Sequence, residues 1–547
     1  MIFLVWSASA LVFFRHTWTT GFRQITGNLG DTRLAIYLDE HWLLVFKGHS
    51  SWLNPAYFYP LKGVLGWTDT FLLDQIFYAP LRELGADQFL SFELTLIAAS
   101  LVGFVGFVLL AKMLFHVPLS VALAGGWLFS FANNLAIHAS ETQLFGVYFL
   151  PGITCLAVLA WRNLAARNRR SAVLFMILGV VYGLFLFSFY YVAWLSLLAA
   201  GVLFIVTAAL SPGPMMRRLA HKLKGGWLPL ASGICAFGLA IIPFLRTYVP
   251  VIDEFGGRNF KNVLSYAPTL RDLLPANSNL LWGPILSDHP ATYEASYAIT
   301  PVLFLVVVVA GPFVLWRYRV GSSENRNGLT RTTIALCITT LILMVLPMKA
   351  GSSSFWIIVW QFPGAKAIRA SDRLEVVTDL VASLAFVAVA TIVLERAQTR
   401  RRSPEAQWRQ ALVVAIGLAL AIVVCFEQLN TGPSANISRD QQLALLQAVP
   451  APPRTCESFY LTDSVNRSER PYVYQIDAML ISQKIGLPTL NGYSGETPFK
   501  WRLTFPEPRY TFYATRWALQ NHVPLSGICE LDIGRMTWTT ALSSAPS

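Results

Sequence analysis

The sequence predicts a mainly α-helical, polytopic membrane protein of about 11 spans, with a small extracytoplasmic α/β domain at its C-terminal end. Three observations lead to this fold class. Of the 547 residues, 54% are hydrophobic and only 13% are charged, whereas soluble proteins carry about 25% charged residues. The cations gather in a few loops between long apolar segments. Polarity rises in the tail, from about residue 430.

The apolar segments are close to the length needed to cross about 30 Å of hydrocarbon. We expect spans at 1–14, 91–111, 118–137, 143–160, 171–189, 191–210, 227–248, 297–316, 332–349, 376–394 and 410–428, within a multi-span domain of residues 1–429. The segment Met1–Phe14 is shorter than the roughly 20 residues of an ordinary span. We expect it to be tilted, extended by its flanks or clipped by the choice of start codon.

Clusters of Lys and Arg follow the fourth, sixth, eighth and tenth spans, and such loops stay on the cytoplasmic side. Their members are Arg162, Arg167, Arg169 and Arg170; Arg217, Arg218, Lys222 and Lys224; Arg317, Arg319, Arg326 and Arg331; and Arg396, Arg400, Arg401, Arg402 and Arg409. This pattern predicts an N-terminus inside, a C-terminus outside, and outer loops at 15–90, 249–296 and 350–375. The net charge of +12 is then mostly a matter of topology, and we expect no nucleic-acid partner.

The tail, residues 430–547, reads as an extracytoplasmic C-terminal α/β domain. SFYLTD and CELDI suit strands, and YQIDAMLISQKIG suits an amphipathic helix that ends at Gly486. PTLNGYSGETP, from Pro488 to Pro498, is a turn-rich connection. Cys456 and Cys529 both lie in this tail, and an oxidising compartment favours a disulfide between them.

The first outer loop holds an unusual density of charge, in GNLGDTRLAIYLDEHW from Gly27 to Trp42. A turn there runs into an amphipathic helix, which we expect to lie on the membrane surface. Asp31 suits either a helix N-cap or, beside Arg33, a general base. Asp39 falls about two turns later, near the same face. Asp39, Glu40 and His41 are consecutive, which disfavours a metal site, although an oxygen-ligated divalent cation shared with another loop stays open.

The same loop is rich in aromatic residues, and two interpretations compete. One is an aromatic belt at the membrane interface. The other is a groove in which rings stack on a sugar and polar side chains bind it. The candidate acceptor or sugar contacts are Tyr37, Trp52, Tyr57, Tyr59, Trp67 and Asp69.

The outer loop 350–375 places Lys366, Arg369 and Arg373 directly before a span. Pairing with Asp372 and Glu375 is one explanation. The other is a clamp for a phosphate or pyrophosphate, since Arg binds phosphate through two hydrogen bonds and Lys adds a point charge. The preceding FWIIVWQF is too short to span and suits a re-entrant or interfacial element.

Polar residues at the outer end of the third span are Asn133, Asn134, His138 and Glu141. They suit either the lining of the same outer cavity or a structural hydrogen-bond network. The irregular outer loop 249–296 suits a lid or an acceptor-binding loop.

The chain resembles the GT-C superfamily of membrane glycosyltransferases. GDTRLAIYLDEHW is similar to the first-loop acidic motif of that superfamily, with Asp31, Arg33 and Tyr37 as the preferred match and the Asp39–Glu40 pair as the alternative. PGAKAIRASDR is similar to basic segments in its outer loops, and NGYSGETPFKW to uncharacterised bacterial membrane proteins of this type.

The resemblance implies an inverting glycosyltransferase that uses a polyprenyl-phosphate-linked sugar. Asp31 would be the base, with Asp39 or Glu40 as runner-up, and Arg33, Lys366, Arg369 and Arg373 would bind the donor phosphate. The expected location is the bacterial inner membrane, with membrane lipids around the chain and the active site on the outer face. The competing hypotheses are a flippase or transporter of lipid-linked glycans, disfavoured because the charges lie outside the midplane, and a non-catalytic envelope-assembly protein.

Overall fold

The structure is a computed structural model that describes residues 1–164, 168–210, 212–273, 278–286, 299–310, 324–399, 404–432, 434–465, 470–504 and 510–540. Several predicted features fall outside these residues. They are the middle of the outer loop at 274–277 and 287–298, the end of the predicted span at 311–316, and the cations Arg167, Arg317, Arg319, Arg400, Arg401 and Arg402.

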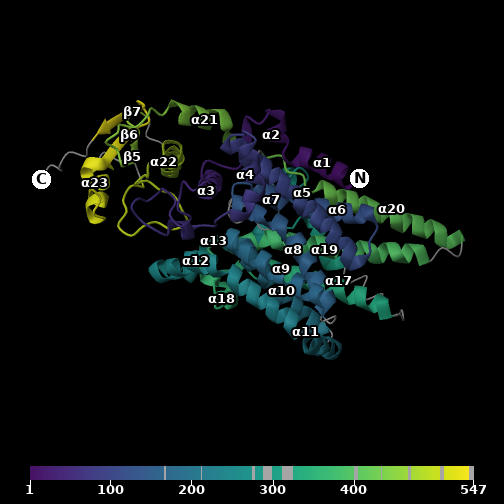
Figure 1. The fold of residues 1–547 in the computed structure, drawn as a ribbon. Coiled ribbons are helices and arrows are strands. Elements are labelled where there is room, and N and C mark those ends of the chain that lie inside the picture. The colour runs from purple at the N-terminus through teal and green to yellow at the C-terminus, as the bar shows by residue number, and fades with distance from the viewer. Residues whose placement is uncertain are drawn as a thin grey trace.

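Most of the chain forms a bundle of long apolar helices, which makes it a multi-pass membrane protein (Figure 1). Within the described residues, seven helical segments are long and apolar enough to cross a membrane. They comprise α5 (Gln88–Phe115), α6 (Leu119–Ser130) with α7 (Asn133–Ile137), η3 (Thr142–Phe149) with α8 (Leu150–Asn163), α9 (Arg169–Ser188), α10 (Tyr190–Leu210), part of α17 (Glu324–Val345), and η8 (Asp372–Leu374) with α19 (Glu375–Thr399).

The remaining predicted spans are shorter or bent. The span expected at 227–248 is the end of α11 (Pro212–Ala240) joined to α12 (Ile242–Phe255) at an angle of 54°, and it would make an eighth span. α1 (Ile2–Phe13) and the described part of α20 (Pro404–Phe426) are shorter apolar helices. Residues 301–310 form α15 (Pro301–Leu305) and a π-helical turn, η6 (Val306–Ala310). The total of eleven and the orientation stay predictions.

The C-terminal lobe, by which we mean the described residues from 434 to 540, is built around a three-stranded sheet. β5 (Ser458–Thr462) pairs in parallel with β6 (Ile528–Asp532), and β7 (Thr537–Thr540) pairs antiparallel with β6. α22 (Pro471–Ile485) packs against β5, α21 (Arg439–Ala448) packs against α22, and α23 (Tyr510–Gln520) packs against the turn that leads into β6. α22 ends where Gly486 adopts a positive φ of 72°, as the helix prediction requires.

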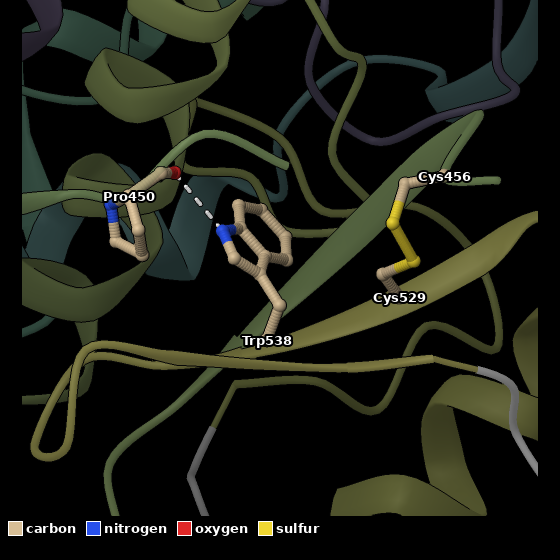
Figure 2. Close-up of a disulfide and its surroundings, with 4 residues drawn as sticks. All are labelled: Pro450, Cys456, Cys529 and Trp538. Carbon is tan, nitrogen blue, oxygen red and sulfur yellow. Dashed lines mark hydrogen bonds between the residues drawn. A yellow bond between two sulfur atoms is a disulfide. The ribbon is translucent and has the colours of Figure 1, made fainter. Parts of the chain in front are cut away.

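A disulfide joins the entry to β5 with β6 (Figure 2). The Cα atoms of Cys456 and Cys529 are 5.6 Å apart, and both side chains are buried. Beside it, the indole of Trp538 on β7 donates a hydrogen bond to the carbonyl of Pro450 over 3.0 Å. The chain that enters the lobe is therefore fixed to its sheet at both places.

The lobe is joined to the first loop by backbone pairing. β1 (Gln24–Thr26) pairs antiparallel with β4 (Ala435–Ser438). The N–H groups of Phe58 and Tyr59 donate to the carbonyls of Asn491 and Thr489 over 2.8 and 2.9 Å. One hydrophobic core therefore runs from the bundle into the lobe.

The charged stretch of the first loop forms α3 (Asp31–Phe46), as expected, but its surroundings differ from the prediction. Leu34, Tyr37, Leu38 and Trp42 are each at most 4% exposed, because α22 packs against α3 on the side of the lobe and α4 (Gln75–Glu83) and α5 on the side of the bundle. Figure 1 shows α3 between the helix bundle and the C-terminal lobe. The expectation of a helix lying on the membrane surface is wrong, since its apolar face is covered by protein.

Candidate active site

Asp31 is the first residue of α3 and is not the N-cap that one interpretation of the sequence assigned to it. Gly30 occupies that position, without a capping side chain. Its N–H donates to Oδ1 of the Asn28 side chain over 2.8 Å. The half-buried Asp31 carboxylate accepts a hydrogen bond from the Tyr493 hydroxyl, at 2.7 Å from Oδ1. A carboxylate in the first turn is also favoured by the helix dipole.

Two arginines of the loop before α19 interact with Asp31 or with its partner Tyr493. Arg373 is 9% exposed and has its guanidinium 5.2 Å from the ring centre of Tyr191, and the charges of Glu141, Asp372 and Asp31, in decreasing order, act on it. Arg369 lies 4.8 Å from the ring centre of Tyr266, and its charge acts on Tyr493. We call Asp31, Arg369, Arg373 and Tyr493 the Asp31 site.

The cations of this loop form no direct ion pair with the acids next to them among the described residues, although the charge of Asp372 acts on Arg373 at longer range. Among the described residues, none of Lys366, Arg369 and Arg373 has a carboxylate within the 4.0 Å of a salt bridge. Glu375 instead lies 2.5 Å from Nε2 of His138. The exposed Lys366 has its ammonium 4.7 Å from the ring centre of Trp360. The explanation of these cations by Asp372 and Glu375 is therefore wrong at the level of direct ion pairs.

The two alternative bases occupy different surroundings from Asp31. Asp39 is fully buried, and burial together with the charge of Asp74 raises its pKa well above the usual value. Burial raises the pKa of Asp74 to about 8. Glu40 forms a two-pronged ion pair with Arg82 at 2.8 and 2.9 Å. Of the three carboxylates, Asp31 is the one whose charge acts on Arg373.

Arg33 lies away from the cations with which the sequence grouped it. Its fully buried guanidinium forms an ion pair with Asp477 of α22 and donates to Gln442 over 2.9 Å and to the Val473 carbonyl over 3.0 Å. Nε donates to the Leu29 carbonyl over 2.9 Å. These bonds leave no exposed donor for a phosphate, and they fix α3 to the C-terminal lobe.

The aromatic candidates of the first loop pack inside the protein. Tyr37 and Tyr57 are fully buried with ring centres 5.6 Å apart. Trp67 packs against Phe255 at 5.2 Å. Tyr59 pairs with the lobe through its backbone, and its carbonyl accepts from Trp517 over 2.8 Å.

Trp52 packs edge-on against Phe187 at 6.3 Å, and its carbonyl lies 3.1 Å from Nε2 of His41. Asp69 is buried and accepts from the Tyr190 N–H over 2.6 Å, and burial raises its pKa to about 7. These contacts support neither an exposed aromatic belt nor a sugar groove made of this set.

A buried polar network includes Glu141 and Glu375, and the charge of Arg373 acts on both of them. His138 lies between Glu141, at 3.4 Å, and Glu375, at 2.5 Å. Burial lowers the pKa of His138, but these carboxylates outweigh it and raise that pKa well above its usual value. Asn134 donates to Asp379 over 3.1 Å. The network interpretation of these residues is the one that their contacts support.

Sequence reasoning missed Tyr493. The residue stands 462 positions after Asp31, and the only local signal was the turn-rich composition of Pro488–Pro498. No periodicity relates two loops so far apart. As for metal ions, the described part of the chain holds no group of three or more His, Cys, Asp or Glu side chains placed to bind one.

These features define a multi-pass helical membrane protein with an acidic and basic site between its bundle and its C-terminal lobe. The chain is similar to an oligosaccharyltransferase from Archaeoglobus fulgidus, solved with Zn and sulfate, at 13% identity over 97% of this chain and 68% of that chain, with a TM-score of 0.49.

Two further solved structures are similar. The mycobacterial arabinofuranosyltransferase AftD matches 90% of this chain and 31% of its own at 12% identity, with a TM-score of 0.42. ArnT from Cupriavidus metallidurans, bound to undecaprenyl phosphate, matches 89% of this chain and 85% of its own at 11% identity, with a TM-score of 0.39. No family model and no curated protein sequence matches the chain.

Proposed function

We propose that this chain is a GT-C-type glycosyltransferase that moves a sugar from a polyprenyl-phosphate donor to an acceptor hydroxyl outside the bacterial inner membrane. One observation carries the proposal: Asp31 shares a site with Arg369 and Arg373, and neither guanidinium has a carboxylate within salt-bridge distance among the described residues. A base next to unpaired cations suits a reaction in which a hydroxyl loses a proton while a phosphate leaves.

In the proposed reaction, Asp31 accepts the proton of the acceptor hydroxyl. The acceptor oxygen then forms a bond to the anomeric carbon from the face opposite the phosphate, so the configuration inverts. The bond between the anomeric carbon and the phosphate oxygen breaks, and its electron pair stays on the lipid phosphate. Arg369 and Arg373 stabilise that growing negative charge because they are in place before the reaction begins.

A cluster of exposed apolar side chains next to these cations supports a lipid-anchored donor. Phe355, Ile358 and Phe362 are 61%, 60% and 54% exposed, around the short helix α18 (Trp356–Val359). Lys366 follows a few residues later. Apolar side chains beside a cation suit the boundary between lipid tails and headgroups, where the phosphate of a polyprenyl chain would lie.

A carrier of lipid-linked glycans is the second candidate, and a different observation favours it. Glu375 and Asp379 are buried on α19, inside a segment long enough to span the membrane. Ionisable residues at such depth often mark a transport path. Their partners His138 and Asn134 also fit a structural network. The arginines of the Asp31 site, by contrast, lie before the start of α19.

The first experiment compares carboxylate variants in a deletion strain. Asp31→Asn should abolish the glycan or glycolipid that the wild-type gene restores, while the protein remains abundant in the membrane. Asp440→Asn, on the exposed surface of α21, is the matched control and should restore it fully. A carrier needs no base at Asp31, so full restoration by Asp31→Asn, measured by mass spectrometry, would reject the catalytic assignment.

The second experiment measures binding of a polyprenyl phosphate to purified protein in detergent by native mass spectrometry. Arg369→Ala and Arg373→Ala should each weaken binding by roughly tenfold or more, the usual effect of losing a charged hydrogen bond. Arg535→Ala, on an exposed turn of the lobe, should bind like the wild type. Equal binding by all variants would remove the phosphate role from these arginines.

A further inference from the structure

We infer that Tyr493 is a positioning residue for the Asp31 carboxylate, so that the C-terminal lobe completes the active site. The inference rests on the proposed function and adds to it a residue that no motif indicated. Asp31 belongs to the first loop, whereas Tyr493 belongs to the connection between α22 and α23. The bundle and the lobe thus each contribute one partner of a single hydrogen bond.

The hydrogen bond from Tyr493 uses only one of the two oxygens of the Asp31 carboxylate. The Tyr493 hydroxyl donates to Oδ1 of Asp31 over 2.7 Å. Within the described contacts, Oδ2 accepts no hydrogen bond, and it is not among the buried polar atoms that lack a partner. One oxygen is therefore fixed, and the other remains accessible to an acceptor hydroxyl, which is the arrangement that a general base requires.

The loop that carries Tyr493 is held in place from both sides. A side chain at Gly492 would come within 2.5 Å of the Phe58 ring, and one at Gly495 would come within 2.5 Å of the Trp67 carbonyl oxygen, so only glycine allows these approaches. Arg258 donates to the Gly495 carbonyl over 2.8 Å. The first loop and the loop before α13 (Phe260–Tyr266) together fix the position of the hydroxyl.

The core of the lobe holds the same loop from behind. The side-chain amide of Asn491 donates to Gln475 of α22 over 2.9 Å and to the Tyr510 hydroxyl of α23 over 2.7 Å, and its oxygen accepts from the Leu461 N–H over 2.8 Å. The core of the lobe therefore fixes where the Tyr493 hydroxyl lies relative to the Asp31 carboxylate.

The charges around Asp31 keep Tyr493 in its role as donor. Burial and the negative charge of Asp31 raise the pKa of Tyr493 far above neutrality, although the positive charge of Arg369 opposes this. Arg373 faces Asp31 from η8, and the ring of Tyr472 at the start of α22 lies 6.0 Å from that of Tyr493. The Tyr493 hydroxyl therefore keeps its proton and remains the donor in the hydrogen bond to Asp31.

The test removes one oxygen atom. Tyr493→Phe deletes the hydroxyl and keeps the ring, and Tyr513→Phe, on α23, is the matched control. Purified variants are added to membranes of the deletion strain, and the restored glycoconjugate is followed by mass spectrometry. For Tyr493→Phe we expect kcat to fall roughly tenfold with little change in KM.

The outcomes separate this inference from the proposed function. If Asp31→Asn is inactive and Tyr493→Phe has the kcat and KM of the wild type, the positioning role is wrong and the base assignment stands. A lower melting temperature of Tyr493→Phe with an unchanged kcat shows a structural role only, which also overturns the inference. If Asp31→Asn is active, the proposed base is wrong and the positioning role is lost with it.

Discussion

Replacing Arg33 tests whether this residue binds the donor phosphate or stabilises the contact between α3 and α22. The sequence grouped this residue with the donor-binding cations, whereas the structure places it in an ion pair with Asp477 between α3 and α22. In the variant Arg33→Met, the apolar stem stays and the guanidinium is removed. The prediction is a large loss of stability with no direct effect on phosphate binding.

The size of this stability loss follows from the buried groups that lose their partner when the guanidinium is removed. Arg33 is fully buried, and the side chain of Asp477 is 8% exposed, so its carboxylate would stay in the interior without its cation. Removing one partner of a buried ion pair usually costs about 3–5 kcal/mol. The acceptors on Gln442 and Val473 also lose their donor. The loss is large beside the roughly 5–15 kcal/mol that stabilises an ordinary domain.

The assay is thermal unfolding of the purified protein in detergent, together with limited proteolysis of the C-terminal lobe. We expect Arg33→Met to melt well below the wild type and to expose the lobe to protease. The double variant with Asp477→Leu should recover most of the loss, because a well-packed apolar pair can replace a buried ion pair. A variant that melts like the wild type but no longer binds polyprenyl phosphate would refute this reasoning and return Arg33 to the donor site.

Three further predictions concern the lobe, an alternative base and a buried acid. Replacing Cys456 and Cys529 by serine should destabilise the lobe by up to about 4 kcal/mol, the chain entropy of a 73-residue closure, as measured by unfolding under non-reducing conditions. Glu40→Gln should cost about 2 kcal/mol of stability through its pair with Arg82 but leave glycan restoration intact. Asp69→Asn should raise the melting temperature at pH 8 more than at pH 4. The pKa of Asp69 is about 7 in the folded protein and near 4 when unfolded, so charging it removes stability between these values and the full penalty remains above pH 7.

Each of these has a result that contradicts it. A serine variant with an unchanged lobe stability would show that the disulfide constrains little. Loss of the glycan in Glu40→Gln, with normal protein abundance, would make Glu40 the better candidate for the base. An equal change in melting temperature for Asp69→Asn at pH 4 and pH 8 would show that the carboxyl of Asp69 does not titrate between these values.

The sequence predicted elements better than it predicted their surroundings. The helix from Asp31, the strand around Ser458 and the helix that ends at Gly486 all form as expected, because hydrophobic period, turn residues and caps are local signals. α3 was nevertheless expected on the membrane surface. Its apolar stripe is compatible with lipid and with protein, and only the docking of α22 distinguishes the two.

The site shows the same division between local signals and distant contacts. Arg33 and Asp31 are two residues apart in the sequence, yet they point to different partners, Asp477 and Tyr493. On a helix such neighbours lie about 200° apart, so the sequence alone could not assign both to one function. The cations at 366, 369 and 373 were predicted from their placement before a span, but their lack of direct ion pairs is visible only in three dimensions.

By itself the sequence determined that this chain is a multi-pass membrane protein, since apolar length and low charge follow directly from composition. It also predicted that an acidic stretch and a basic stretch lie in outer loops, and that orientation stays a prediction. Only the tertiary structure decided that Asp31, rather than Asp39 or Glu40, lies beside those cations, and that Tyr493 of the C-terminal lobe bonds to it. The physical reason is that burial and pairing depend on contacts between segments hundreds of residues apart, which no local pattern encodes.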